Sequence, residues 1–160
     1  MRTLLLATLL LFTATAARAD IVRLAPDFSY PGPGAKARTL KGLRGQAVVL
    51  LIARSPGEGD FKKQLRYLRE IYQQFASKEV VFVAALQEGD GSPVKSDIPF
   101  AVASNGPGIA ASYGVDGDFA IVIIGRDGNI DYQTKKVLTP ERVRDVIQNS
   151  FSVQVTARKQ

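Results

Sequence analysis

The chain has 160 residues, of which 46% are hydrophobic, and carries 21 basic and 15 acidic side chains. This length fits one globular domain with a substantial core. The sequence contains no cysteine and no histidine. Disulfides, thiol chemistry, the commonest zinc ligand and the usual general base near neutral pH are therefore excluded. Any chemistry has to use carboxylates, lysine, arginine, tyrosine or serine.

Residues 1–19 have the pattern of a secretory signal peptide. Arg2 gives a basic start, Leu4–Phe12 is apolar, and Ala17-Arg18-Ala19 puts small residues at the expected cleavage positions. The apolar run is far shorter than the roughly 20 residues that span a bilayer. We expect cleavage after Ala19 and a soluble, periplasmic or secreted product without a transmembrane segment.

The net charge of the expected mature chain is modest. Removal of Arg2 and Arg18 lowers the basic count from 21 to 19 against 15 acidic residues, so the net charge falls from +6 to +4. The charges are interspersed along the chain, and an exported protein rarely meets a genome. Nucleic acid is therefore not expected as a partner.

The pattern predicts an irregular lead-in over residues 20–39 and an α/β domain over residues 40–151. Ala47–Ala53 is a continuous apolar run, which is typical of a strand covered on both faces. A second such run covers residues 80–86, so we expect two parallel strands with a right-handed helical crossover between them. The crossover helix is predicted from apolar residues at helical spacing: Phe61, Leu65, Leu68, Tyr72 and Phe75.

A polar loop, Gln87–Pro93, follows the second strand, and its acids lack the alternation of a calcium loop, so no metal site is predicted. The next expected elements are a short strand over Phe100–Val102 and a short helix over Gly108–Tyr113. Phe119–Ile124 predicts a third strong strand. The Asp-Gly pair that follows indicates a hairpin to a strand over Ile130–Tyr132.

The start of a last helix is predicted at Thr139-Pro140-Glu141, with threonine as the N-cap and proline at the first helical position. Its buried side is expected at Val143, Val146 and Ile147. Residues 152–160 are expected to form a flexible tail.

Several short motifs resemble those of thioredoxin-like proteins. Ala25-Pro26-Asp27-Phe28 and Leu40–Gln46 are similar to the N-terminal part of peroxiredoxins and of periplasmic thiol-disulfide oxidoreductases of the cytochrome-maturation type. The resemblance implies an α/β, thioredoxin-like three-layer fold: a mixed central sheet, a βαβ unit, a β-hairpin and a C-terminal helix. Further motifs are similar to the second half of the same proteins: Ile98-Pro99-Phe100, Ala111–Val115, Ile123–Ile130 and Leu138–Glu141.

The chain departs from these proteins at their reactive positions. The resemblance places the Cys-x-x-Cys motif at Glu58-Gly59-Asp60-Phe61 and the substrate-holding cis-proline at Phe119. Both cysteines and the proline are missing, and a residue other than proline strongly favours a trans bond. The resemblance therefore implies that thiol-disulfide and peroxidase chemistry are absent.

Asp118-Phe119 with the apolar run behind it, and Gly125–Gly128, resemble a second group. This group is the cysteine-free, peroxiredoxin-like domain of small secreted bacterial proteins and of animal sushi-repeat matrix proteins. The resemblance implies an extracytoplasmic domain without established chemistry, and an adhesive role is one option.

Three functions stay open. The first is a non-catalytic module that binds a protein or an envelope component, without a cofactor. The second is an enzyme that uses Glu58 and Asp60 near Asp118 as acid–base groups. The third is a salt-sensitive binder of anionic surfaces through Lys62, Lys63, Arg66 and Arg69.

The partner and the oligomeric state are left open. The candidate binding rim for the first function consists of Arg54, Ser55, Pro56, Gly57, Glu58, Gly59, Asp60, Asp118 and Phe119.

Asp60 stands directly before the predicted crossover helix, in the N-cap position. Thioredoxin-like folds use the free amides and the dipole of this helix start to stabilise a thiolate. An N-cap aspartate can accept hydrogen bonds from the same amides. We therefore expect Asp60 to fill the position that a thiolate would otherwise occupy.

Overall fold

A five-stranded mixed sheet forms the centre of the protein. The computed structural model describes residues 23–32, 34, 36–75, 80–89 and 93–157, with side chains up to Phe151, so the expected signal peptide lies outside the described residues. The sheet has the order β5-β4-β3-β6-β7. Its strands are β3 (Ala47–Ala53), β4 (Val80–Leu86), β5 (Ala101–Val102), β6 (Phe119–Ile124) and β7 (Ile130–Thr134).

The β3–β4 pair and the β6–β7 hairpin have the directions that the sequence predicts. β3 and β4 are parallel and in register from Ala47 with Val80 to Ala53 with Leu86, and β5 runs parallel to β4. β6 lies antiparallel to β3 on the other side, and β7 returns antiparallel to β6. A βαβ unit followed by a β-hairpin is therefore present.

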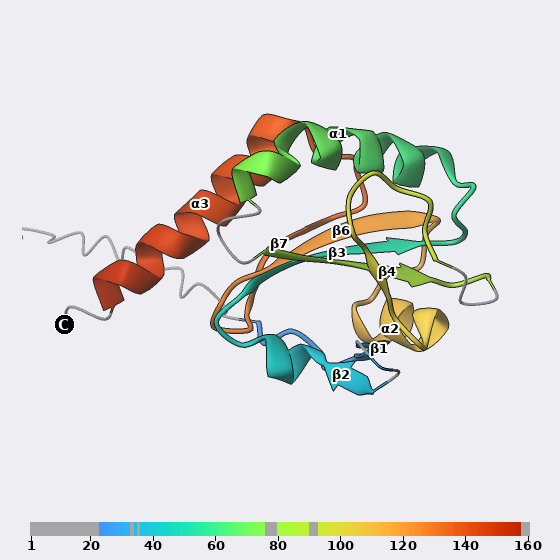
Figure 1. Ribbon diagram of the computed structural model, residues 1–160, viewed down its shortest axis with the longest axis horizontal. Helices are drawn as coiled ribbons and strands as arrows, with labels where there is room; N and C mark the ends of the chain where they lie inside the picture. Colours follow the sequence, from blue (N-terminus) through green and yellow to red (C-terminus); the bar gives the residue numbers. More distant parts are fainter. Residues whose placement is uncertain (1–22, 33, 35, 76–79, 90–92, 158–160) are drawn as a thin grey trace, which may run out of the picture.

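Helices cover both faces of the sheet. α1 (Gly59–Phe75) and α3 (Pro140–Ala157) pack on one face. The short helix α2 (Gly106–Ser112) lies on the other face, together with a small antiparallel sheet of β1 (Ser29–Pro31) and β2 (Ala37–Thr39) (Figure 1). The predicted three-layer α/β architecture is confirmed. Within the described residues, no helix combines the length and apolar character needed to cross a bilayer.

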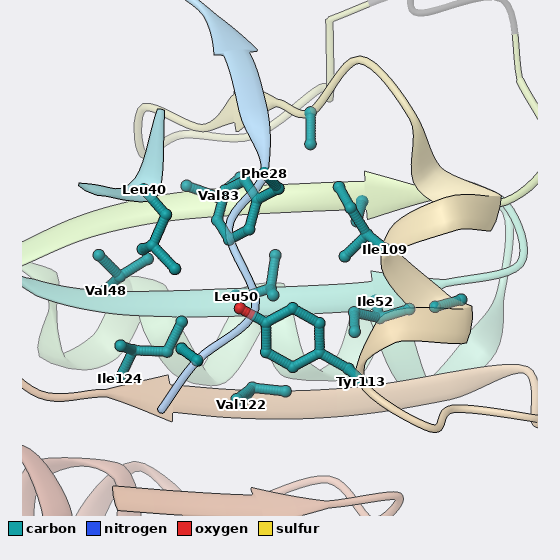
Figure 2. Packing of buried hydrophobic residues seen from close by; sticks show 14 of the residues in the cluster. Phe28, Leu40, Val48, Leu50, Ile52, Val83, Ile109, Tyr113, Val122 and Ile124 are labelled. Carbon is teal, nitrogen blue, oxygen red and sulfur yellow. The ribbon is translucent and has the colours of Figure 1, made fainter. Parts of the chain in front are cut away.

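The side chains of β3 alternate between two hydrophobic cores, as expected for a strand buried on both faces. Val48, Leu50 and Ile52 face the α2 side, where they meet side chains of β6, β4 and the N-terminal segment (Figure 2). Tyr113, after α2, enters this core, and its hydroxyl donates a hydrogen bond to the carbonyl oxygen of Pro26 at 2.8 Å. This contact ties the N-terminal segment to the core.

The buried face of α1 extends beyond the predicted apolar stripe. Phe61, Leu68 and Phe75 are buried, and Leu65 and Tyr72 are partly buried. Ile71 and the polar Gln64 are also buried. The hydrophobic core on this side therefore contains a polar side chain that the apolar spacing does not predict.

The start of α3 agrees with its sequence signals. The hydroxyl oxygen of Thr139 accepts a hydrogen bond from the amide of Arg142 at 3.3 Å, and Pro140 is the first helical residue. Val143, Val146 and Ile147 are buried as expected.

Three segments differ from the expectations. The lead-in over residues 20–39 contains β1 and β2, because Tyr30 is buried in the core and the carbonyl of Ser29 accepts from the amide of Ser104 at 3.0 Å.

The other two differences concern helix ends. α2 begins at Gly106, two residues before the predicted start, because the Asn105 side chain accepts from the Gly108 amide. α3 continues to Ala157 into the expected flexible tail, since no proline or glycine interrupts residues 141–157.

Candidate functional site

The predicted rim lies at the carboxyl end of β3, where the chain leaves the sheet and enters α1. The amide of Arg54 donates to the carbonyl of Asp118 at 2.8 Å, and the amide of Glu88 donates to the carbonyl of Arg54 at 2.7 Å. These bonds join the loops that follow β3 and β4 to the segment before β6. The fold therefore brings together Arg54, Asp118 and the end of β4 at one edge of the sheet.

An ion pair spans this edge. A guanidinium nitrogen of Arg54 lies 2.5 Å from a carboxylate oxygen of Asp118, and both side chains are more than half exposed. Such exposed pairs contribute about 1 kcal/mol or less to stability. The predicted neighbourhood of Arg54 and Asp118 is present, and the charge of Asp118 is balanced by Arg54.

The start of α1 is capped by Glu58. One Glu58 carboxylate oxygen accepts hydrogen bonds from the amide of Asp60 at 2.7 Å and from the amide of Phe61 at 3.2 Å. α1 begins at Gly59, so Asp60 lies in its first turn and is exposed. The prediction that Asp60 caps the helix is therefore wrong. A carboxylate of the chain does bind the free amides at the helix start, but it belongs to Glu58, the residue just before the helix.

The turn before α1 places the cap. The amide of Glu58 donates to the carbonyl of Ser55 at 3.2 Å, and the amide of Lys62 donates to the carbonyl of Glu58 at 3.1 Å. Ser55 and Glu58 are half-buried, whereas Pro56, Gly57 and Gly59 are exposed. Between Arg54 and Asp60, which are themselves exposed, the loop presents Pro56 and two glycines to solvent.

Phe119 does not belong to the exposed rim. It is the first residue of β6, pairs with Ala53 of β3, and is only 3% exposed. Its side chain contributes to the hydrophobic core under α1 and α3. The inclusion of Phe119 in a binding surface is therefore wrong, because the first residue of this strand already faces the core.

The end of β4 contributes residues that the sequence analysis did not include in the rim. The side-chain amide of Gln87 donates to the carbonyl of Gly117 at 3.2 Å, and the amide of Gln87 donates to the carbonyl of Ala53 at 2.9 Å. Glu88 beside it is exposed. The predicted strand order could have identified these two residues, because neighbouring parallel strands end at the same edge of a sheet.

The acid–base hypothesis finds little geometric support at this edge. The carboxylate of Glu58 accepts from two helix amides, and that of Asp118 pairs with Arg54. In the part of the chain that the structure describes, no three acidic side chains gather in a way that could hold a metal ion. A partly open pocket of about 270 Å³ lies elsewhere, at the amino end of β3 near Val48 and Leu24.

Several solved structures that align with this one are named as thiol:disulfide interchange proteins, thioredoxins or peroxidoxins. A protein assigned as thiol:disulfide interchange protein DsbE from Chlorobium tepidum aligns with a TM-score of 0.65 at 21% identity, over 81% of this chain and 96% of its own. Peroxidoxin BcpB from Mycobacterium tuberculosis aligns with a TM-score of 0.57 at 16% identity, over 82% and 96%. The exposed lipoprotein thioredoxin of Streptococcus pneumoniae gives 0.58 and 17%, over 78% and 99%.

No protein-family model and no curated protein matches the chain. The structural similarity nevertheless establishes a thioredoxin-like fold, in agreement with the resemblance drawn from the motifs. The chain itself has no cysteine, and the described peptide bonds, including the one before Phe119, are trans. At the helix start, which stabilises a thiolate in thioredoxin-like proteins, this chain has Glu58 and the amides it binds.

Proposed function

We propose that the chain is an exported, non-catalytic, thioredoxin-like module that binds a protein or another envelope component through the corrected rim. The corrected rim consists of Arg54, Ser55, Glu58, Gly59, Asp60, Glu88 and Asp118. The observation that carries the proposal is the cap: the helix amides that could stabilise a reactive anion are bound by Glu58. Together with the absence of cysteine, this favours recognition over catalysis at this edge.

The charges of the rim indicate what kind of partner surface it fits. Arg54 and Asp118 neutralise each other, whereas Asp60 and Glu88 are exposed and have no ion pair among the described residues. The exposed surface is therefore mildly acidic and surrounded by small loop residues. Loops held on a rigid scaffold are common places for recognition. A partner with basic or hydrogen-bond-donating groups complements this surface.

Binding is tested by affinity capture from an envelope extract with the protein and a triple variant, Arg54→Ala/Asp60→Ala/Asp118→Ala. The captured partner is expected to be lost. The matched control, Lys36→Ala/Glu70→Ala/Asp145→Ala, removes the same charges from exposed positions elsewhere and should retain the partner. Equal capture by the triple variant and the parent protein would move the binding surface away from the rim.

Export is tested separately. The full chain is produced in a bacterial host, and the N-terminus of the protein in the extracytoplasmic fraction is sequenced. A mature chain that begins at Asp20 is expected from the signal pattern. An uncleaved protein retained in the cytoplasm would contradict export without affecting the test of the rim. One structural neighbour, the pneumococcal thioredoxin, is described as an exposed lipoprotein, which supports an extracytoplasmic setting.

A further inference from the structure

A polar cleft of about 590 Å³ lies beside the outer face of α1. Segment 93–99, which leads into β5, forms its opposite wall. We call it the basic cleft, and its lining residues are Lys62, Leu65, Arg66, Arg69, Lys95, Ser96 and Asp97. It is separate from the corrected rim, with which it shares no residue.

The basic cleft has an unbalanced charge. Four of its side chains are cationic and one, Asp97, is anionic. Arg69 pairs with Asp97 at 2.8 Å, whereas Lys62, Arg66 and Lys95 form no ion pair within the described residues. Lys62 and Arg66 are also four residues apart on one helix, a spacing at which like charges repel. The folded chain thus leaves three cations gathered around one space.

Glu58, at the start of the same helix, does not relieve this charge. Glu58 stands four residues before Lys62, a favourable spacing for an ion pair. Its carboxylate, however, accepts from the amides of Asp60 and Phe61, which hold it at the helix start. The positive field in the basic cleft therefore remains available to an external anion.

The walls of the cleft are held by contacts that do not involve the three unpaired cations. The Arg69–Asp97 pair joins α1 to segment 93–99. The hydroxyl of Ser96 accepts from the amide of Ile98 at 3.2 Å, and the side chain of Ile98 is buried in the core. These contacts place segment 93–99 opposite α1 and leave the three unpaired cations available to a ligand.

We propose that the basic cleft binds a ligand that carries a phosphate group, through Lys62, Arg66 and Lys95. A multiply charged anion matches three converging cations better than a single carboxylate. Arginine donates two parallel hydrogen bonds to phosphate oxygens, and lysine supplies point charges. The volume exceeds that of a bare phosphate and accommodates a phosphate ester, either a free small molecule or the headgroup of a lipid.

The two sources are separated by two probes with the same chemistry. Soluble glycerol 1-phosphate and vesicles that contain phosphatidic acid, both of which present a phosphate monoester, are titrated into the isotope-labelled protein while backbone amide signals are recorded. Vesicles of zwitterionic phosphatidylcholine, which have no net charge, are the reference. Saturable shifts are expected at Lys62, Arg66 and residues 95–97. Binding of glycerol phosphate assigns a soluble ligand, whereas binding of the anionic vesicles alone assigns a lipid headgroup. If neither probe binds saturably at these residues, the proposal fails.

Charge variants test whether the binding is local. Lys62→Ala/Lys95→Ala is expected to weaken the affinity for the bound probe at least about tenfold, since hydrogen bonds to charged groups are among the stronger ones. The control, Lys36→Ala/Lys41→Ala, removes two lysines on the side of β2 and should change affinity less than about twofold, because screening limits distant charges. Equal weakening by both variants would show only nonspecific attraction and would overturn the site.

Discussion

Glu58 determines how the helix start is closed, and its removal is the direct test of the cap. Glu58→Ala leaves the amides of Asp60 and Phe61 without their side-chain acceptor, so the free energy of unfolding is expected to fall by about 1 kcal/mol. Asp60→Ala removes only a first-turn charge and should cost about 0.3 kcal/mol. Urea denaturation of both variants measures the difference. A larger loss for Asp60→Ala would restore the cap expected from the sequence.

Among the described residues, Gln64 is the only buried polar side chain, and it lies in the core between the sheet and the helices α1 and α3. Both ends of its amide form hydrogen bonds. Its nitrogen donates to the carbonyl of Leu138 at 3.1 Å, and its oxygen accepts from the amide of Leu138 at 2.8 Å. The side chain thus binds the backbone that precedes α3 in the same way as a neighbouring strand would.

Gln64→Leu is expected to lower the free energy of unfolding by about 2–4 kcal/mol, because two buried backbone groups lose their partner. The control is Gln73→Leu on the exposed face of the same helix, which should stay within about 0.5 kcal/mol. Thermal and urea unfolding of both variants give the comparison. Equal stability of the two variants would mean that the Leu138 contacts carry no net stabilisation.

At the scale of elements, α2 is placed by a close backbone approach. A Cβ atom at Gly106 would lie 1.7 Å from the carbonyl oxygen of Leu86, at the end of β4. That oxygen belongs to the sheet and cannot move aside like a flexible side chain. The start of α2 therefore packs on β4 at a distance that only glycine allows.

Gly106→Ala is expected to cost about 3 kcal/mol or more, since α2 or the end of β4 has to move. Gly59→Ala is the matched control, because a Cβ at Gly59, the first residue of α1, meets no neighbouring atom. It should be neutral or stabilising by about 0.5 kcal/mol. Chemical denaturation measures both, and a tolerated Gly106→Ala would contradict the close packing of α2.

Across the whole molecule, the sequence predicts best what depends on local composition. β3, β4 and β6 are continuous apolar runs because both of their faces are covered, and the hairpin follows from its Asp-Gly turn. β1 and β2 escape prediction because their residues are mostly exposed and only Tyr30 enters the core. Their pairing depends on tertiary contacts, such as the bond from Ser104 to Ser29, which have no local signal.

The location of the rim could be predicted from strand order, but not its details. Arg54 and Asp118 follow from the meeting of β3 and β6 at one edge. With Asp60 as the N-cap, α1 would begin at Phe61, but it begins two residues earlier, at Gly59, so Glu58 becomes the cap. Sequence patterns do not fix helix boundaries that closely. The burial of Phe119 depends on which face of the sheet the first strand residue meets, because strand side chains alternate.

Three carboxyl groups influence in opposite directions how the stability of the whole fold depends on pH. Hydrogen bonding with Lys135 lowers the pKa of Asp116, and hydrogen bonds at the start of α3 lower the pKa of Glu141. These two groups contribute stability above their unfolded pKa values, and that contribution is lost as pH falls through the lower folded values. Burial raises the pKa of Asp131, with the Ser150 hydroxyl partly offsetting the rise and Asp127 adding to it.

Because the folded pKa of Asp131 lies above its ordinary value of 3.8, the opposite sign applies to it. Its contribution is favourable below that value and is lost as pH rises through the folded pKa. Asp131→Asn is therefore expected to increase the free energy of unfolding at about pH 7 and to change it little at about pH 3. Urea denaturation at both pH values measures this, with Asp145→Asn on α3 as the control for the lost charge. If Asp131→Asn were less stable than the parent protein at neutral pH while Asp145→Asn were unchanged, the ionised Asp131 would stabilise the fold, which contradicts the raised pKa.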